Sequence, residues 1–170
     1  MLMRWIPLLV ILVLSFLSGN YIIHNIEDFN KKRMSLLSLV YMTLLGAILF
    51  TPMSFNGIDA YVMPAGVGRV NLYHIYYDVG FFENIILTIP LGFLIKKSFT
   101  ELSIVSMIPV GLMIGAAIET MQYYLSHAFL INRTSDISDV VANGIGIVVG
   151  SILLLIYQQT YEKQLLNNRI

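Results

Sequence analysis

Five stretches of mostly apolar residues follow one another along the chain, and each is close to the length that crosses a bilayer. They cover residues 5–23, 36–53, 79–95, 104–126 and 140–157. A helix needs about 20 apolar residues to span the hydrocarbon core, so the second and third stretches must extend at their ends, or the bilayer must thin around them. We therefore predict an all-α, polytopic membrane protein with about five transmembrane helices.

The composition indicates a single membrane domain over residues 1–170. Hydrophobic residues make up 57% of the chain and charged residues only 12%, whereas a soluble domain carries roughly 25% charged residues. The ten basic and ten acidic residues cancel, and no nucleic-acid motif is present, so we expect no nucleic-acid partner. The chain has no cysteine, which excludes disulfides, thiol catalysis and cysteine metal sites.

The first apolar stretch imitates a secretion signal, because Arg4 precedes it and Ser18-Gly19 lies near its end. Its apolar character continues through Ile23, and no Ala-x-Ala site follows. We therefore expect a retained first helix over residues 5–23.

The distribution of lysine and arginine predicts the orientation, since cytoplasmic loops carry an excess of both. One side of the predicted topology holds seven basic residues, which are Lys31, Lys32, Arg33, Lys96, Lys97, Lys163 and Arg169. The other side holds Arg4, Arg69 and Arg133. We therefore expect the N-terminus outside and the C-terminus in the cytoplasm.

The longest loop, residues 54–78, lies outside the cell in this topology. It contains several glycines, among them Gly57, and a group of tyrosines, Tyr73, Tyr76 and Tyr77. We expect the tyrosines at the headgroup level as an interfacial belt. A re-entrant or surface helix also fits this loop, and the sequence assigns it no function.

Polar side chains gather at one end of the third, fourth and fifth stretches. Glu119 lies 15 residues into the fourth stretch, which at about 1.5 Å per residue places it roughly 22 Å above the cytoplasmic end. The third and fifth stretches start on the outer side, so their first turns reach the same depth. We expect one polar site near the outer leaflet, made by Asn84, Glu119, Gln122, Arg133, Asp136, Asp139 and Asn143.

Helical spacing predicts how these stretches pack. One stripe of the fourth stretch carries Gly111, Gly115, Glu119 and Gln122, and one stripe of the fifth carries Asp136, Asp139, Asn143, Gly146 and Gly150. Small residues four apart allow helices to approach closely in lipid. We expect the fourth and fifth helices to pack through these stripes. Glu83 and Asn84 are adjacent and point about 100° apart, so one of them faces the seam.

Each of these polar residues also has a purely structural reading. Glu119 could form a structural ion pair or, as a protonated carboxyl, bond to Gln122 or Asn143, and Asn143 could join two helices. Asp136 and Asp139 also suit the start of a helix, as a cap and a first-turn acid. Arg133 could be an interfacial anchor or a clamp for an anionic group such as phosphate. A scaffold without a site is therefore an alternative to a binding site.

An intramembrane enzyme is a further alternative. Glu119 would act as general base or acid, and Asp136 and Asp139 would orient water or ligate a metal. The three carboxylates could hold a hard divalent cation through oxygen, although no motif requires a metal. His24, His74 and His127 are isolated and show no metal-ligand spacing.

The combined motifs resemble the VanZ-like family, which is associated with teicoplanin resistance. The pattern reads Glu119-x-x-Gln122, then Arg133-x-x-Asp136-x-x-Asp139-x-x-x-Asn143-x-x-Gly146-x-x-x-Gly150. Upstream, Arg69-Val-Asn71-Leu72 and the segment from Asn84 to Pro90-Leu-Gly92-Phe93 also match. The sequence departs from the family at Tyr73-His74, where the family commonly has a proline two residues after the leucine.

The resemblance covers residues 69–154, about half of the chain, and leaves the first helix and the tail outside. It implies a multi-pass protein of a bacterial plasma membrane whose founding relative lowers susceptibility to glycopeptide antibiotics. It brings no settled reaction or cofactor. The partner we expect is a membrane lipid or another cell-envelope component, and the sequence gives no oligomeric state.

Overall fold

The computed structural model describes residues 2–55 and 58–167, and of these it leaves the side chains of Phe55 and residues 162–167 undescribed. Gly57 and Arg169, used above for the second loop and the orientation, lie outside the described residues. The elements follow in the order η1 (Leu2–Trp5), α1 (Ile6–Asn25), α2 (Phe29–Phe50), β1 (Met53–Phe55), β2 (Ala60–Val62), β3 (Val70–Asn71), α3 (Val79–Ser98), α4 (Ile104–Phe129), β4 (Ser135–Asp136) and α5 (Ile137–Asn167).

Five helices of the described chain are long and apolar enough to cross a membrane, which confirms the predicted all-α, polytopic architecture. The second one, α2, begins seven residues earlier than predicted, so Lys31, Lys32 and Arg33 lie in its first turns rather than in a loop. Asp28 explains this early start, because its carboxylate accepts a hydrogen bond from the backbone N–H of Lys31 at 2.6 Å. Hydropathy alone therefore missed the polar first turns of α2 and predicted a helix that begins too late.

The chain divides into two compact units, which are described separately. Unit 1 comprises residues 1–71 and 120–135, and unit 2 comprises residues 72–119 and 136–170. The helix α4 contributes its first part, up to Glu119, to unit 2 and its last part to unit 1.

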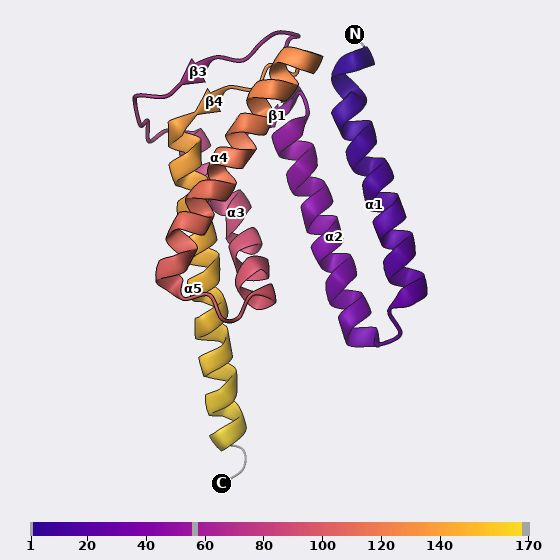
Figure 1. Cartoon of the computed structure of the whole chain (residues 1–170), viewed down its shortest axis with the longest axis vertical. Helices are drawn as coiled ribbons and strands as arrows, with labels where there is room; N and C mark the ends of the chain where they lie inside the picture. Colours follow the sequence, from indigo (N-terminus) through magenta and orange to yellow (C-terminus); the bar gives the residue numbers. More distant parts are fainter. Residues whose placement is uncertain (1, 56–57, 168–170) are drawn as a thin grey trace. The chain divides into compact units, whose positions relative to one another are not determined.

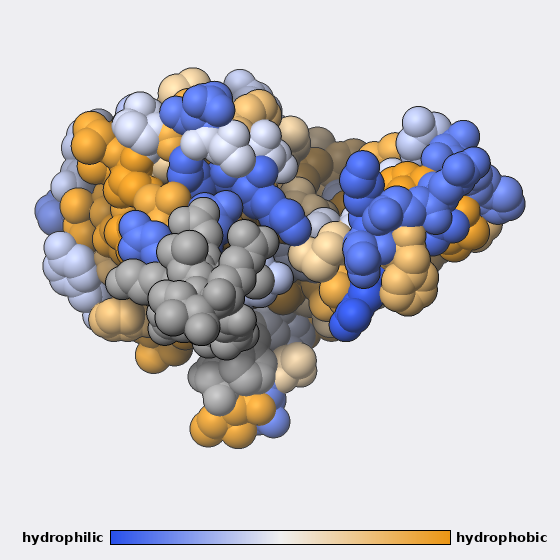
Figure 2. All heavy atoms as spheres, turned by 90° about the horizontal axis from the view of Figure 1, so that it is seen from below, coloured by the Kyte–Doolittle hydropathy of each residue, from blue (hydrophilic) through white to orange (hydrophobic). Residues whose placement is uncertain are grey.

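Unit 1 contains the antiparallel hairpin of α1 and α2, seen in Figure 1 as the indigo and purple helices. Ser15 and Thr43 join the two helices through a hydrogen bond of 2.7 Å. A Cβ at Gly46 would come within 3.5 Å of Ile11, so the glycine allows ordinary contact at this point. Hydrophilic side chains gather where the hairpin turns, over the right-hand part of Figure 2, while apolar side chains cover its flanks.

The described part of the second loop contains short strands and no helix, so the predicted re-entrant or surface helix is wrong there. The strands β1 and β2 pair antiparallel, with Ser54 opposite Tyr61. Arg4 reaches this hairpin from η1 and donates to the carbonyl of Met63 at 2.5 Å. Backbone pairing satisfies the polar groups of the loop without a helix.

Unit 2 is built around α5, which lies between α3 and the first part of α4. Its two small-residue faces make both contacts: a Cβ at Gly146 would overlap Thr88 of α3, and one at Gly150 would overlap the carbonyl of Ile89. On the other side, a Cβ at Gly115 of α4 would lie 2.6 Å from the carbonyl oxygen of Val140. The helix backbones therefore touch, as small residues permit in lipid.

This packing corrects the predicted partner of the fifth helix. The stripe with Gly146 and Gly150 packs against α3, not against α4. The helix α4 uses its predicted stripe, but it meets α5 at Val140 and Gly144. The reason is that α5 carries small residues on two nearly opposite faces, and only one of them lies in the stripe that the motif marks.

Candidate functional site

The predicted site residues fall into both units. Unit 2 holds five of them, which are Asn84, Glu119, Asp136, Asp139 and Asn143, and unit 1 holds Gln122 and Arg133. The two groups have different surroundings. In unit 2 the residues surround the N-terminal turns of α5, and in unit 1 they contact the C-terminal end of α2.

In unit 1, Arg133 and Gln122 donate to carbonyls at the end of α2 and just beyond it. The Nη2 group of Arg133 donates to the carbonyls of Ile48 and Met53, and its Nε donates to the carbonyl of Thr51 at 3.2 Å. The side-chain Nε2 of Gln122 donates to the carbonyl of Leu49 at 3.0 Å.

The bonds to Ile48 and Leu49 satisfy two of the carbonyls that every helix leaves without a partner at its end. The last four carbonyls of an α-helix receive no hydrogen bond from an N–H group of the same helix, and the hydrocarbon core of a membrane offers them no donor. The hydroxyl of Thr51 supplies one more donor, to the carbonyl of Ala47 at 2.6 Å. The positive charge of Arg133 also suits the negative end of the helix dipole. Both residues therefore close the end of α2 within unit 1.

The loop that carries Arg133 is itself fixed. Ser126, at the end of α4, donates to the carbonyl of Arg133 at 2.9 Å and accepts from its N–H at 2.8 Å. A Cβ at Gly68 would overlap the carbonyl of Arg133, so only glycine permits this approach. The N–H of Ser135 donates to the carbonyl of Arg69 at 2.9 Å. Sequence reasoning missed Ser126, and its spacing from Arg133 gave no signal.

In unit 2, Glu119 and Asp136 hold the start of α5. The Oε2 atom of Glu119 accepts from the backbone N–H of Asp136 at 2.9 Å. Asp136 precedes the first residue of α5, and its Oδ1 atom accepts from the N–H of Ser138 at 2.7 Å. This is the helix cap that the structural reading of Asp136 predicted. Asp139 lies in the first turn, where the dipole favours a carboxylate.

Ser138 joins the same turn to the end of the loop before α3. Its hydroxyl accepts from the N–H of Tyr76 at 2.9 Å and donates to the carbonyl of His74 at 3.3 Å. Ser138 is buried, and the motif reading did not include it. The only sequence signal was its place between the two aspartates.

Asn143 differs from its neighbours because its side-chain amide has no partner. The residue is 1% exposed, and neither Oδ1 nor Nδ2 has a hydrogen bond to any described residue. Its backbone carbonyl accepts from the hydroxyl of Thr88 at 3.2 Å. The predicted alternative in which Glu119 bonds to Asn143 is therefore wrong. The other alternative, a bond to Gln122, is also wrong, because the amide nitrogen of Gln122 is directed to Leu49.

Asn84 belongs to the same seam. It lies one turn before Thr88 on α3, and the hydroxyl of Thr88 is within 2.7 Å of its carbonyl. Asn84 and its neighbour Glu83 are both half-buried, so their exposure does not show which of the two faces the seam. The contact of Thr88 with Asn143 identifies the face that Asn84 shares.

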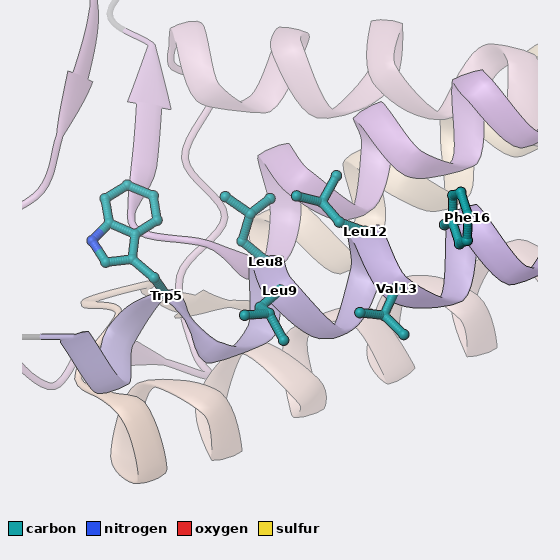
Figure 3. Close-up of a pocket in the computed structure, with 6 residues that line it drawn as sticks. All are labelled: Trp5, Leu8, Leu9, Leu12, Val13 and Phe16. Atoms are coloured by element: carbon teal, nitrogen blue, oxygen red, sulfur yellow. The ribbon is translucent and has the colours of Figure 1, made fainter.

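The described residues were also compared with two other kinds of site, a metal centre and an apolar pocket. Among the described residues, no three His, Asp or Glu side chains are placed to hold a metal ion. An open apolar hollow lies on η1 and α1, and Figure 3 shows that all its lining side chains come from this one segment. They are Trp5, Leu8, Leu9, Leu12, Val13 and Phe16. This lining offers no carboxylate or amide.

Comparison with known proteins identifies the family. No curated protein and no solved structure shows a significant match to the chain. The family model described as VanZ/LLP1 matches residues 4–158. The match is wider than the motif resemblance over residues 69–154, because it also includes α1 and α2. It covers both the α2 cap of unit 1 and the carboxylate and amide group of unit 2, and the chain therefore belongs to the VanZ/LLP1 family.

Proposed function

We propose that this multi-pass membrane protein binds a polar part of an envelope lipid or cell-wall component at the start of α5. One observation carries the proposal: the amide of Asn143 is buried and has no hydrogen-bond partner among the described residues. A buried polar group without a partner costs about 1–3 kcal/mol, and more in a purely apolar solvent. A ligand that bonds to this amide removes the cost.

The surroundings of Asn143 support a ligand. Side chains on a helix lean toward its N-terminus, so the side chain of Asn143 starts out toward the turn that carries Asp139. Glu119 lies at the same end, bonded to the N–H of Asp136. The lysine and arginine distribution predicts that this end is the outer one, so the proposed ligand is reached from the outer leaflet. An effect on glycopeptide susceptibility is part of this proposal and rests on the family.

Arg133 and Gln122 support the proposal less than the sequence suggested. Their donors are directed to carbonyls at the end of α2 in unit 1. A role for them in ligand binding stays a prediction. The proposal therefore rests on Asn84, Glu119, Asp136, Asp139 and Asn143.

Native mass spectrometry of the protein, extracted in lipid nanodiscs from its own membrane, tests the proposal. We expect a bound envelope component on the wild type and its loss from Asn143→Leu, which removes the amide at similar size. Ser151→Ala is the matched control, because Ser151 is also buried on α5 but already bonds to the carbonyls of Ile147 and Gly92. Equal retention of bound molecules in all three proteins would refute the proposal.

The intramembrane enzyme is kept as the alternative because Glu119 is a buried carboxylate beside the same turn. Lipid profiles of cells that express the wild type or Glu119→Gln separate the two functions. A lipid product that depends on Glu119 would favour the enzyme. Unchanged lipid profiles together with Asn143-dependent binding would favour the binding protein.

A further inference from the structure

The open hollow on η1 and α1 is apolar along its whole length. Its lining residues recur at helical spacing along one stripe, from Trp5 to Phe16, and the hollow has a volume of about 500 Å³. At about 1.5 Å per residue this stripe is roughly 16 Å long, which is half of a hydrocarbon core about 30 Å thick. The hollow therefore has the length of an acyl chain in one leaflet.

The lining favours an acyl chain over a helix of another protein. Helices approach one another in lipid through small residues, and the lining of the hollow contains none. Gly19 of α1 belongs to the contact with α2, because its Cβ would lie 3.5 Å from the side chain of Leu39. A flexible hydrocarbon chain gains dispersion contacts along an uneven apolar surface without needing small residues.

The end of the hollow nearest the N-terminus offers a hydrogen-bond donor. The indole nitrogen of Trp5 lies on the side of the ring away from the other five lining side chains (Figure 3). Its N–H has no hydrogen-bond partner among the described residues. At a membrane interface a tryptophan keeps its ring in the apolar region and its N–H among the headgroups. The polar end of a lipid would therefore lie beside Trp5.

Arg4 precedes Trp5 and carries a positive charge that no carboxylate of the described residues pairs with. Its Nη2 donates to the carbonyl of Met63 at 2.5 Å, and its buried Nε has no hydrogen-bond partner among the described residues. Arg4 is only partly buried, and a guanidinium has five N–H donors, so donors remain beside the bond to Met63. Phosphate is an acceptor whose charge and geometry suit arginine.

We infer that the hollow binds an anionic phospholipid, with one acyl chain along the stripe and the phosphate beside Arg4. The N–H of Trp5 donates to the ester carbonyl that joins the chain to the headgroup. The lysine and arginine distribution predicts that the N-terminus faces outward, so this lipid belongs to the outer leaflet. Arg4, Met63 and the hollow all belong to unit 1, and the inference does not depend on the proposed site at the start of α5.

Trp5 is the only tryptophan of the chain, so its fluorescence reports on this hollow alone. The full chain is placed in phosphatidylcholine nanodiscs, and phosphatidylglycerol or phosphatidylcholine with brominated acyl chains is added at increasing mole fraction. Bromine quenches tryptophan fluorescence on contact, so the two quenching curves give the relative affinity of the hollow for the two lipids. The lipids share their acyl chains and differ in the net charge of the headgroup.

We expect wild type to prefer phosphatidylglycerol by about fivefold, the effect of one basic residue on an anionic lipid. Arg4→Gln should remove this preference, because the amide has no charge to offer the phosphate. Arg69→Gln is the control for general attraction, since Arg69 is an exposed arginine of the same unit. It should keep the preference of the wild type.

Leu9→Phe tests the apolar part of the site and leaves the bond from Arg4 to Met63 in place. Leu9 lines the hollow and is 63% exposed, so the change does not disturb the packing of α1 on α2. The larger ring takes up room that the acyl chain needs, and the preference for phosphatidylglycerol should fall. Leu14→Phe is the matched control, because Leu14 is 58% exposed on α1 and does not line the hollow.

Several outcomes overturn the inference. Equal quenching of wild type by the two lipids shows ordinary contact with the surrounding bilayer. A preference that survives Arg4→Gln, or that Arg69→Gln removes equally, refutes the place of the phosphate beside Arg4. If Arg4→Gln yields no folded protein, Leu9→Phe and Leu14→Phe decide, and equal behaviour of these two variants refutes the hollow as the binding surface.

Discussion

Replacing Arg133 by methionine should destabilise unit 1, because the carbonyls of Ile48, Thr51 and Met53, at the end of α2 and just beyond it, lose their donor at once. Methionine keeps much of the apolar stem and removes the guanidinium. The bond from Nε to the carbonyl of Thr51 is part-buried, and a hydrogen bond to a charged group contributes about 1.5–3 kcal/mol. The two bonds from Nη2 are more exposed, and we count each at the neutral value of about 0.5–1 kcal/mol. The expected loss is about 2.5–5 kcal/mol in the free energy of unfolding.

The assay is unfolding of the purified protein in mixed micelles, combined with hydrogen exchange of residues 47–53. We expect faster exchange in the last turn of α2 and in β1, because the carbonyls no longer have a charged partner. Arg133→Lys should recover less than half of the loss, since lysine cannot reach three carbonyls with a planar group. Arg69→Met is the control, because Arg69 is exposed and contributes its backbone carbonyl.

One result would refute this reasoning. If Arg133→Met unfolds like the wild type and exchange at the end of α2 is unchanged, the capping role is wrong. Loss of a bound envelope component in the same variant would then return Arg133 to the ligand site that the motif predicted.

Three further predictions concern unit 2. In the absence of ligand, Asn143→Leu should leave the free energy of unfolding unchanged or raise it by about 1–3 kcal/mol, because the buried amide has no partner to lose; a clear loss in thermal unfolding would show that the amide is bonded. Gly146→Ile should prevent α3 from packing on α5 and abolish folded protein in size-exclusion chromatography, whereas Gly80→Ala should not, since the nearest atom to its Cβ is 3.3 Å away on the Asp78 side chain. Lys96→Met should cost about 2–4 kcal/mol in the same unfolding assay, because the buried ammonium holds the carbonyls of Thr100 and Leu102; an unchanged midpoint would contradict that role.

The prediction for Lys96 illustrates a limit of counting charges. The sequence placed Lys96 in a cytoplasmic loop as one of seven basic residues. The structure places Lys96 in the last turn of α3 with 7% exposure. Its Nζ donates to the carbonyl of Leu102, in the loop that precedes α4. A lysine count thus indicates a membrane side, but it does not show that a given lysine is held inside the fold.

Spacing along the sequence also does not show what each polar side chain does. The spacing of the carboxylates and amides predicted one site, whereas the contacts give its residues different roles. Gln122 bonds to the end of α2, and Asp136 caps α5. The side-chain amide of Asn143 has no hydrogen-bond partner among the described residues. A side chain's role depends on which backbone groups end near it, and helix ends are the least certain part of a sequence-based assignment: α2 began seven residues before the expected start.

The sequence by itself determined the five membrane-crossing helices and the family motif, because hydropathy and spacing are properties of the chain alone. Only the tertiary structure decided which helix meets each face of α5. Its small residues at Gly144 and at Gly146 and Gly150 permit two partners, and periodicity treats both faces alike. The tertiary structure also decided which polar groups serve the backbone, since an unpaired carbonyl takes the nearest donor, and nearness across helices is set by packing.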